Sequence, residues 1–121
     1  MACLLKIPVF KDFRGSLAVF EASCPFRIKR SYWFYNASAA RGGHRHRTNR
    51  QMMFALHGSV SVYVHDGNIP KEYLLQTPEE GLLLEPADWH RMEEFSTDCV
   101  LLVFASEPYD INDYIDEPYP C

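Results

Sequence analysis

The chain has 121 residues, of which 47% are hydrophobic and 23% charged, so its size and composition are those of one ordinary globular domain rather than of a disordered or membrane protein. No apolar run approaches the ~20 residues of a membrane span, and the N-terminus lacks the pattern of a secretory signal, so we expect a cytoplasmic protein with no membrane partner. The four cysteines form no CxxC pair, which is typical of reduced thiols.

The predicted elements are almost all short strands separated by turn residues, a pattern typical of a sandwich or barrel. Strands are expected at 4–10, 16–21, 28–36, 50–57, 59–65, 71–76, 81–85, 89–95 and 98–105. Valine alternates with other residues along 59–65, and Asp66-Gly67 then predicts a hairpin turn. Prolines predict an irregular tail from about residue 107. With no linker or repeat, the sequence predicts one all-β domain over residues 1–121.

Charge is unevenly distributed along the chain. No acid occurs between Glu21 and Asp66, whereas seven of the twelve basic residues do, and eight acids follow Arg91. The basic window favours an anionic ligand. A pI near 5.7 and the lack of a nucleic-acid motif argue against nucleic acid, so we expect a phosphorylated small molecule.

A pair of histidines, His44 and His46, precedes Gln51 by seven and five residues, and Gly58 follows Gln51 by seven. In a strand both imidazoles project to the same face, with roughly 7 Å between their Cα atoms. The spacing resembles the first metal motif of the cupins, which are all-β jelly rolls, with a glutamine in place of the carboxylate ligand. Residues 81–90 resemble the second cupin motif with shortened spacers.

A three-imidazole metal site is one reading of this pattern. His44, His46 and His90 could bind zinc, iron or nickel. Because the fourth position holds a neutral amide oxygen instead of a carboxylate, the sequence favours a protein without metal or other cofactor.

A narrower resemblance covers nearly the whole chain. It is carried by Asp12-Phe-Arg14-Gly15, by the segment from Pro25 to Tyr35, by Arg41 to Arg47 with Gln51, by Pro86-Ala-Asp-Trp89-His90 and by Tyr109 to Tyr114. These motifs resemble the sugar 3,4-ketoisomerases of the WxcM-like, QdtA and FdtA type. The resemblance implies a small single-domain cupin that moves the ketone of dTDP-4-keto-6-deoxyglucose from C4 to C3 in deoxyamino-sugar biosynthesis, without a cofactor. It also implies a homodimer with exchanged N-terminal strands.

The reaction needs groups that remove a proton from C3 and return one at C4 through an enediol. Histidine can do both near neutral pH, and we expect His44 to be the base and His46 to shuttle or orient the proton, although the two can exchange roles. Tyr32 is expected to hydrogen-bond the enediolate or act as the acid.

Substrate-binding roles follow from residue type. Arg14 or Arg41 would hold the diphosphate or the enolate oxygen, and Arg30 and Gln51 are further candidates for contact with the ligand. The nucleobase needs an aromatic wall, for which the candidates are Trp33, Tyr35 and Trp89. In the run from Tyr32 to Tyr35 only one parity can line the pocket, either Tyr32 with Phe34 or Trp33 with Tyr35.

Three points stay open. The residue between the two histidines is Arg45, where the family usually has alanine, and its direction decides whether it adds a cation to the pocket. His57 and His65 lie outside the motifs and are expected at the surface. Two other functions compete with the isomerase: a metal-dependent small cupin enzyme and a non-catalytic module that binds a nucleotide sugar.

Overall fold

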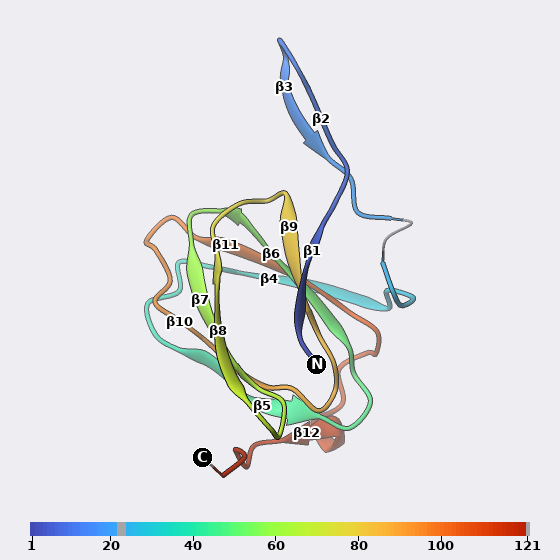
Figure 1. Cartoon of the computed structure of the whole chain (residues 1–121), viewed down its shortest axis with the longest axis vertical. Helices are drawn as coiled ribbons and strands as arrows, with labels where there is room; N and C mark the ends of the chain where they lie inside the picture. The colour runs from blue at the N-terminus through green and yellow to red at the C-terminus, as the bar shows by residue number, and fades with distance from the viewer. Residues whose placement is uncertain (22–23, 121) are drawn as a thin grey trace.

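The computed structural model describes residues 1–21 and 24–120, and strands make up nearly all of its regular structure (Figure 1). The strands are β1 (Cys3–Lys6), β2 (Val9–Asp12), β3 (Gly15–Ala18), β4 (Arg30–Tyr35), β5 (Arg41–His46), β6 (Gln51–His57), β7 (Val60–His65), β8 (Pro70–Leu75), β9 (Glu80–Leu84), β10 (Trp89–Glu93), β11 (Val100–Ala105) and β12 (Tyr114–Ile115). One 3₁₀ turn, η1 (Ile111–Asp113), precedes β12. No helix among the described residues is long and apolar enough to cross a membrane.

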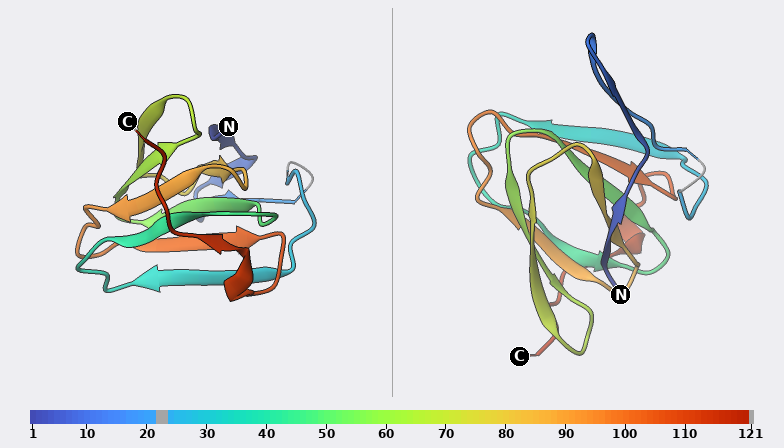
Figure 2. Two further views of the ribbon diagram at one scale, coloured as in Figure 1. Left: turned by 90° about the horizontal axis from the view of Figure 1, so that it is seen from below. Right: turned by 45° about the horizontal axis from the view of Figure 1, so that its top comes forward.

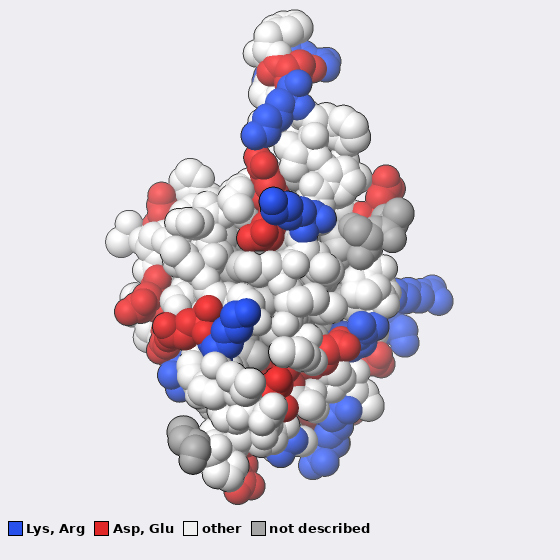
Figure 3. Space-filling model, in the orientation of Figure 1, with Lys and Arg blue, Asp and Glu red and all other residues white. Residues whose placement is uncertain are grey.

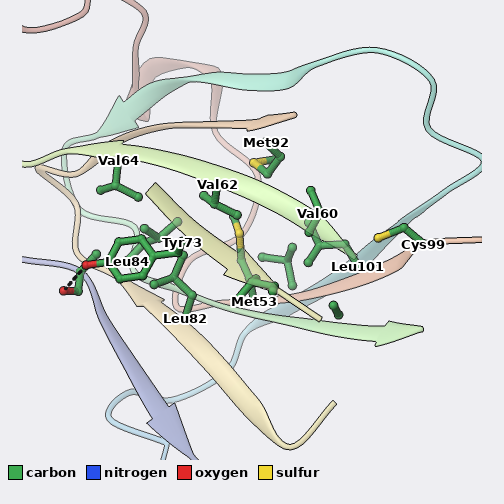
Figure 4. Packing of buried hydrophobic residues seen from close by; sticks show 14 residues of the cluster. Met53, Val60, Val62, Val64, Tyr73, Leu82, Leu84, Met92, Cys99 and Leu101 are labelled. Carbon is green, nitrogen blue, oxygen red and sulfur yellow. Dashed lines mark hydrogen bonds between the residues drawn. The ribbon is translucent and has the colours of Figure 1, made fainter. Parts of the chain in front are cut away.

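Two antiparallel sheets of five strands face each other. One has the order β1-β9-β6-β11-β4, and the other has the order β12-β5-β10-β7-β8. Figure 2 shows the two layers edge-on. The inward residues of both sheets form one apolar core, which Figure 4 shows around Met53, Val62 and Leu101. Burial of alternate side chains explains the alternation seen in the sequence. The prediction of an all-β cupin jelly roll is confirmed.

The outer face of the first sheet carries a second apolar cluster. Met52, Phe54 and Leu83 are buried there, and Phe20 and Phe104 pack against them. Strand β6 is therefore covered on both faces, which explains why its residues 51–55 are all buried.

The N-terminal strand expected at 4–10 is interrupted. It ends as β1 at Lys6, and a separate strand β2 begins at Val9, because Pro8 has no N–H for the ladder. Strands β2 and β3 pair only with each other, and their hairpin projects from the body of the molecule (Figures 1 and 3). The hairpin exposes three large apolar side chains, Phe10, Phe13 and Leu17.

The segment after residue 107 has more structure than the sequence predicts. Asp110 caps η1 by accepting a hydrogen bond from the N–H of Asn112, and β12 then adds to the edge of β5, with Tyr114 opposite His46. The chain continues across the outside of the same sheet (Figure 2). The indole of Trp89 donates to the carbonyl of Asp116 there, and the hydroxyl of Tyr119 donates to the carbonyl of Ala87.

Candidate active site

Three imidazoles meet between the two sheets. His44 and His46 lie on the inward face of β5, and His90 lies opposite His44 on β10. The ring centroid of His44 is 5.0 Å from that of His46 and 5.1 Å from that of His90. One nitrogen from each ring lies within 4.8 Å of the other two. The structure thus brings together the three histidines that the sequence singles out.

Close approach of β5 and β10 depends on Gly42. Its φ is +86°, and a Cβ there would lie 3.1 Å from the carbonyl oxygen of His90. The register of β5 against β10 shifts at this point, between His90 and Arg91. This irregularity breaks the strict alternation of β5, so that Arg41 and His44 both line the same cavity.

Of the two histidines on β5, His46 is the one whose ring is held by a carboxylate. Its side chain is 3% exposed, and its Nδ1 lies 3.1 Å from Oδ2 of Asp113. The other ring nitrogen, Nε2, is buried and has no partner among the described residues. A carboxylate can only accept, so the proton between the two groups resides on Nδ1 and the lone pair on Nε2.

Asp113 stays ionised because it accepts several hydrogen bonds. Its Oδ1 accepts from the backbone N–H and the hydroxyl of Thr48, at 2.9 and 2.8 Å, and its Oδ2 accepts from the N–H of Asn49 at 3.2 Å. Burial acts to raise the pKa of Asp113, but these hydrogen bonds and the nearby His46 outweigh it and lower the pKa.

The three imidazoles are neutral at physiological pH. Burial, with a smaller contribution from His46, lowers the pKa of His44 to about 4. Burial and the nearby His44 lower the pKa of His90 to about 3. Burial also lowers the pKa of His46, against the opposing effect of Asp113. The rings therefore begin any reaction as bases and not as cationic acids.

Tyr32 faces this cluster from the other sheet. On β4 the side chains of Tyr32 and Phe34 point inward, so the first of the two possible parities is the one observed. The Nε2 of Gln51 donates to the Tyr32 hydroxyl oxygen at 2.7 Å, which leaves the hydroxyl proton for another acceptor. Burial raises the pKa of Tyr32 to about 12, so the hydroxyl is a donor at neutral pH.

His44, His90 and Tyr32 line one cavity of about 250 Å³, together with Gly42 and the following side chains: Arg30, Phe34, Arg41, Met92 and Tyr114. His46 is next to this lining, with its ring centroid 5.0 Å from that of His44. The guanidinium of Arg30 lies over the ring of Tyr32 at 4.4 Å, and that of Arg41 over the ring of Phe34 at 4.9 Å. Within the described part of the chain, neither arginine has a carboxylate within ion-pair distance. The cavity therefore offers two unpaired cations beside its neutral bases.

Several residues that the sequence predicts to contact the substrate lie outside the cavity. Trp33 and Tyr35 are exposed on the outward face of β4. Trp89 lies on the face of β10 opposite His90, against Tyr63 and beneath the tail segment at Asp116. None of these three aromatic residues lines the cavity. The aromatic wall expected from Trp33, Tyr35 and Trp89 is therefore not present among the described residues.

Arg14 also lies away from the histidines. It sits at the turn of the projecting β2-β3 hairpin, where its guanidinium forms an ion pair with Asp12 at 2.6 Å. It does not line the cavity, so a role in binding the substrate of its own chain has no support in the geometry.

Arg45 points away from the cavity, as its position between two inward histidines requires. Its guanidinium lies over the ring of Tyr119 at 4.5 Å, on the outer face of the sheet. The guanidinium of Arg45 is therefore not in the pocket. His57 is exposed as expected, but His65 is buried, against the prediction, because Tyr119 packs over its ring.

Two residues of the cavity region were not predicted from the sequence, although both belong to a quoted motif. Asp113 contacts His46, and the ring of Tyr114 lies 4.5 Å from that of His44 and 4.7 Å from that of His46. Their signal is the segment from Tyr109 to Tyr114, which the resemblance included without giving it a role.

Comparisons with known proteins agree with this geometry. The family model FdtA, described as WxcM-like, C-terminal, matches residues 2–119. A curated protein of Aneurinibacillus thermoaerophilus, TDP-4-oxo-6-deoxy-alpha-D-glucose-3,4-oxoisomerase, is 44% identical over 108 residues, which cover 86% of this chain and 78% of that protein.

Solved structures give the same family. One is the 3,4-ketoisomerase QdtA from Thermoanaerobacterium thermosaccharolyticum, solved as a double mutant in complex with TDP. Its sequence is 38% identical to this chain, and the two structures match with a TM-score of 0.92 over 96% of this chain and 87% of the QdtA chain. A 3,4-ketoisomerase from Helicobacter canadensis is 34% identical with a TM-score of 0.91, covering 96% and 90%. A dTDP-4-dehydrorhamnose 3,5-epimerase from Bacillus anthracis, 16% identical with a TM-score of 0.81 over 93% of this chain and 76% of its own, shares the fold. With a family model that matches nearly its whole length, the chain belongs to the FdtA family of WxcM-like proteins.

Proposed function

We propose that this protein is a TDP-sugar 3,4-ketoisomerase, which moves the ketone of a TDP-linked 4-keto-6-deoxyhexose from C4 to C3. The observation that carries the proposal is a buried imidazole, His46, whose Nε2 has no partner within the described residues, next to His44, which lines one cavity with Tyr32. The 44% identity to a TDP-4-oxo-6-deoxyglucose 3,4-oxoisomerase supports the substrate class.

The reaction is a pair of proton transfers. Nε2 of an imidazole takes the proton from C3, and the electron pair forms the C3–C4 double bond as the ketone oxygen at C4 becomes an enediolate oxygen. The Tyr32 hydroxyl donates a hydrogen bond to that oxygen. A proton then returns to C4, and the hydroxyl proton at C3 passes to the oxygen at C4, which leaves a hydroxyl at C4 and the ketone at C3. The net change moves hydrogen between adjacent carbons and needs no oxidant.

The contact with Asp113 is the observation that supports His46, rather than His44, as the base at C3. Asp113 orients the ring of His46, whereas His44 has no carboxylate partner within the described residues. His44, whose ring lies 5.0 Å from that of His46, is then placed to relay or position the proton at C4. This exchanges the roles first expected from the sequence.

Arg30 and Arg41 would bind the diphosphate. Both lie at the cavity without a carboxylate partner among the described residues, and an arginine can bind a phosphate through two parallel hydrogen bonds. Gln51 acts through Tyr32 in this scheme, because its buried amide donates to the hydroxyl oxygen and directs the hydroxyl proton elsewhere.

The test is incubation with TDP-4-keto-6-deoxyglucose in deuterated water, followed by proton NMR at C3 and C4. The expected result is a product with its ketone at C3, formed by wild-type protein and lost in a folded His46→Asn variant. Binding of the nucleotide sugar with no shift of the ketone and no exchange at C3 would identify a binding module and contradict the proposal.

A metal-dependent reaction is the second candidate, because the nitrogens of the three histidines lie within 4.8 Å of one another. Nitrogens bound to one tetrahedral zinc, at about 2.0 to 2.1 Å from the metal, are only about 3.3 Å apart, so the rings would have to rotate inward. Gln51 offers a neutral amide where cupins use a carboxylate, and its Nε2 is turned to Tyr32. Metal analysis of purified protein, with activity before and after dialysis against a chelator, separates the two candidates.

We also propose a homodimer in which the N-terminal strands are exchanged. The β2-β3 hairpin projects from the body of the molecule (Figure 1). At its turn the side chain of Phe13 is 98% exposed, and the strands of the hairpin also expose Phe10 and Leu17. A large apolar group so exposed is unusual for a surface without a partner. Light scattering of wild-type protein and of a Phe10→Ser, Leu17→Ser double variant tests this: the wild type should be a dimer, and the variant should shift toward monomer.

A further inference from the structure

Among the described residues, Asp113 is the carboxylate that lies within ion-pair distance of an imidazole of the three-histidine cluster. Its position is fixed from both its main chain and its side chain. The backbone N–H donates to the carbonyl of Asp110, and the carbonyl accepts from the N–H of Arg47. Both carboxylate oxygens accept hydrogen bonds, from Thr48 and Asn49. A group held by so many contacts cannot rotate to follow the ring beside it, so the ring must follow the carboxylate.

The contact fixes which nitrogen of His46 carries the proton. An isolated imidazole exchanges freely between two neutral tautomers, and only one of them presents a lone pair at Nε2. Because Asp113 accepts the Nδ1 proton, it selects the tautomer in which Nε2 can act as a base. The Nε2 atom has no hydrogen-bond partner among the described residues, so its lone pair is not engaged by another group of the described chain.

The carboxylate also stabilises the product of the first proton transfer. When Nε2 takes a proton, the ring becomes a cation near Arg30, and the neighbouring rings of His44, His90 and Tyr114 supply no negative charge. Asp113, at 3.1 Å from Nδ1, offsets that charge.

We infer that Asp113 is a positioning residue of the isomerisation, which holds His46 in the tautomer and ring orientation that remove the C3 proton. The inference rests on the proposed ketoisomerase function and adds to it a residue outside the histidine motif. Asp113 touches no reacting atom, so its effect must pass through His46.

The perturbation is Asp113→Asn, which keeps the size of the side chain and removes the charge. An amide at this position cannot accept from Thr48, Asn49 and His46 together, because one of its two ends is a donor. We expect kcat to fall about 10²- to 10⁴-fold, the range in which a positioned base contributes, while KM changes less than about threefold.

Asp110→Asn is the matched control. It makes the same substitution three residues earlier in the same segment, where the side chain caps η1 and has no contact with a histidine. Asparagine caps as well as aspartate does, so structure and kcat should both be kept. Thr48→Val removes one hydrogen bond to Oδ1 and should lower kcat only a few-fold.

A readout besides activity separates positioning from general damage to the fold. Nitrogen NMR of protein labelled at the histidine rings reports which ring nitrogen of His46 is protonated. In wild-type protein and in Asp110→Asn the proton should be on Nδ1, and in Asp113→Asn a substantial fraction should move to Nε2.

The outcomes are distinguishable. Wild-type protein that leaves the ketone at C4 removes the proposed function and the inference with it. Wild-type turnover with a folded Asp113→Asn variant that keeps its kcat, or keeps the Nδ1 proton on His46, removes the inference alone. Loss of kcat together with the change of tautomer, in a protein whose unfolding temperature matches that of Asp110→Asn, supports it.

Discussion

Replacement of Tyr32 by phenylalanine tests the proposed mechanism at a single oxygen atom. Strand β4 presents Tyr32 inward and Tyr35 outward, so the same substitution can be made on both faces of one strand. The Tyr32 hydroxyl accepts from Gln51 at 2.7 Å and lines the cavity, whereas the side chain of Tyr35 is 64% exposed. Only the inward hydroxyl can reach a substrate held in that cavity.

The expected loss follows from the role of the hydroxyl. With a pKa raised to about 12 by burial, it is protonated throughout the neutral range and can donate to the enediolate oxygen. Removal of one such donor typically costs about 2.7 to 4 kcal/mol of transition-state stabilisation, which is about 10²- to 10³-fold in kcat. Because a neutral ketone accepts a weaker hydrogen bond than the enediolate, KM should change much less.

The substitution also has a predictable effect on stability. Gln51 is 2% exposed, and without the hydroxyl its Nε2 loses the acceptor that the structure records. An unsatisfied buried donor costs about 1 to 3 kcal/mol, so the free energy of unfolding should fall within that range.

Steady-state kinetics with TDP-4-keto-6-deoxyglucose and urea unfolding measure the two effects separately. Tyr35→Phe should leave kcat, KM and stability unchanged. If folded Tyr32→Phe protein keeps kcat within threefold of the wild type, Tyr32 does not stabilise the enediolate and the mechanism needs another donor.

Three further predictions concern charge. Arg45→Ala should leave kcat within about twofold of the wild type, because the guanidinium lies over Tyr119 on the outer face. Loss of that contact should lower the free energy of unfolding by about 0.5 to 2 kcal/mol. A tenfold loss of kcat would show that Arg45 reaches the substrate. Arg41→Ala should raise KM for the nucleotide sugar at least tenfold, with a smaller effect on kcat. An unchanged KM in kinetic assays, together with an unchanged Kd in direct binding, would remove Arg41 from the diphosphate site. Acid should destabilise the fold, because burial lowers the pKa of His90 to about 3, against about 6.5 in the unfolded chain, so the unfolded state binds more protons between these two values. The free energy of unfolding should therefore fall as the pH drops below about 6.5, by up to about 1.4 kcal/mol per pH unit from this residue. Equal or higher stability at pH 5 than at pH 7.5 in urea unfolding would contradict the burial of a neutral ring.

Much of the fold could be predicted because the strands are short apolar segments separated by turn residues, and some of them have apolar residues at every second position. Strand β7 is the clearest case: Val60, Val62 and Val64 are all buried in the core, and the turn after His65 occurs at Asp66-Gly67 as expected. The apolar strand β11 lies inside its sheet between β6 and β4, with Leu101 and Val103 in the core and Phe104 against the outer apolar cluster, which explains its near-continuous hydrophobic sequence.

The aromatic residues were harder to place because a strand has two faces and the sequence does not show which of them lines the cavity. Trp89 is next to His90 in the chain, and this adjacency itself puts the two side chains on opposite faces of β10. The same rule separates Trp33 from Tyr32. A large aromatic next to a site residue on a regular strand is therefore a poor candidate for the same pocket.

Asp113 and Tyr114 were missed for a different reason. Strand β12 has two residues and follows a proline-containing segment, so no periodic pattern marks it. Its pairing with β5 is a contact between residues about seventy positions apart, and a single sequence carries no signal for such a contact. The register of Tyr114 opposite His46 is what brings the preceding aspartate beside the ring.

The position of Gln51 links the two possible uses of three histidines in a cupin. A metal needs the lone pairs of the imidazoles as ligands, whereas proton transfer needs at least one of them free, so the same cluster cannot serve both at His46. In this chain the residue at the place of the carboxylate ligand gives its hydrogen bond to Tyr32, and the carboxylate of the site, Asp113, lies behind His46 instead of across from it. A carboxylate behind the ring increases the basicity of Nε2, while a carboxylate across the pocket would complete a metal site. Because a carboxylate behind a histidine also supports metal ligation, the amide of Gln51 at the place of the carboxylate ligand is what favours proton transfer over metal binding here.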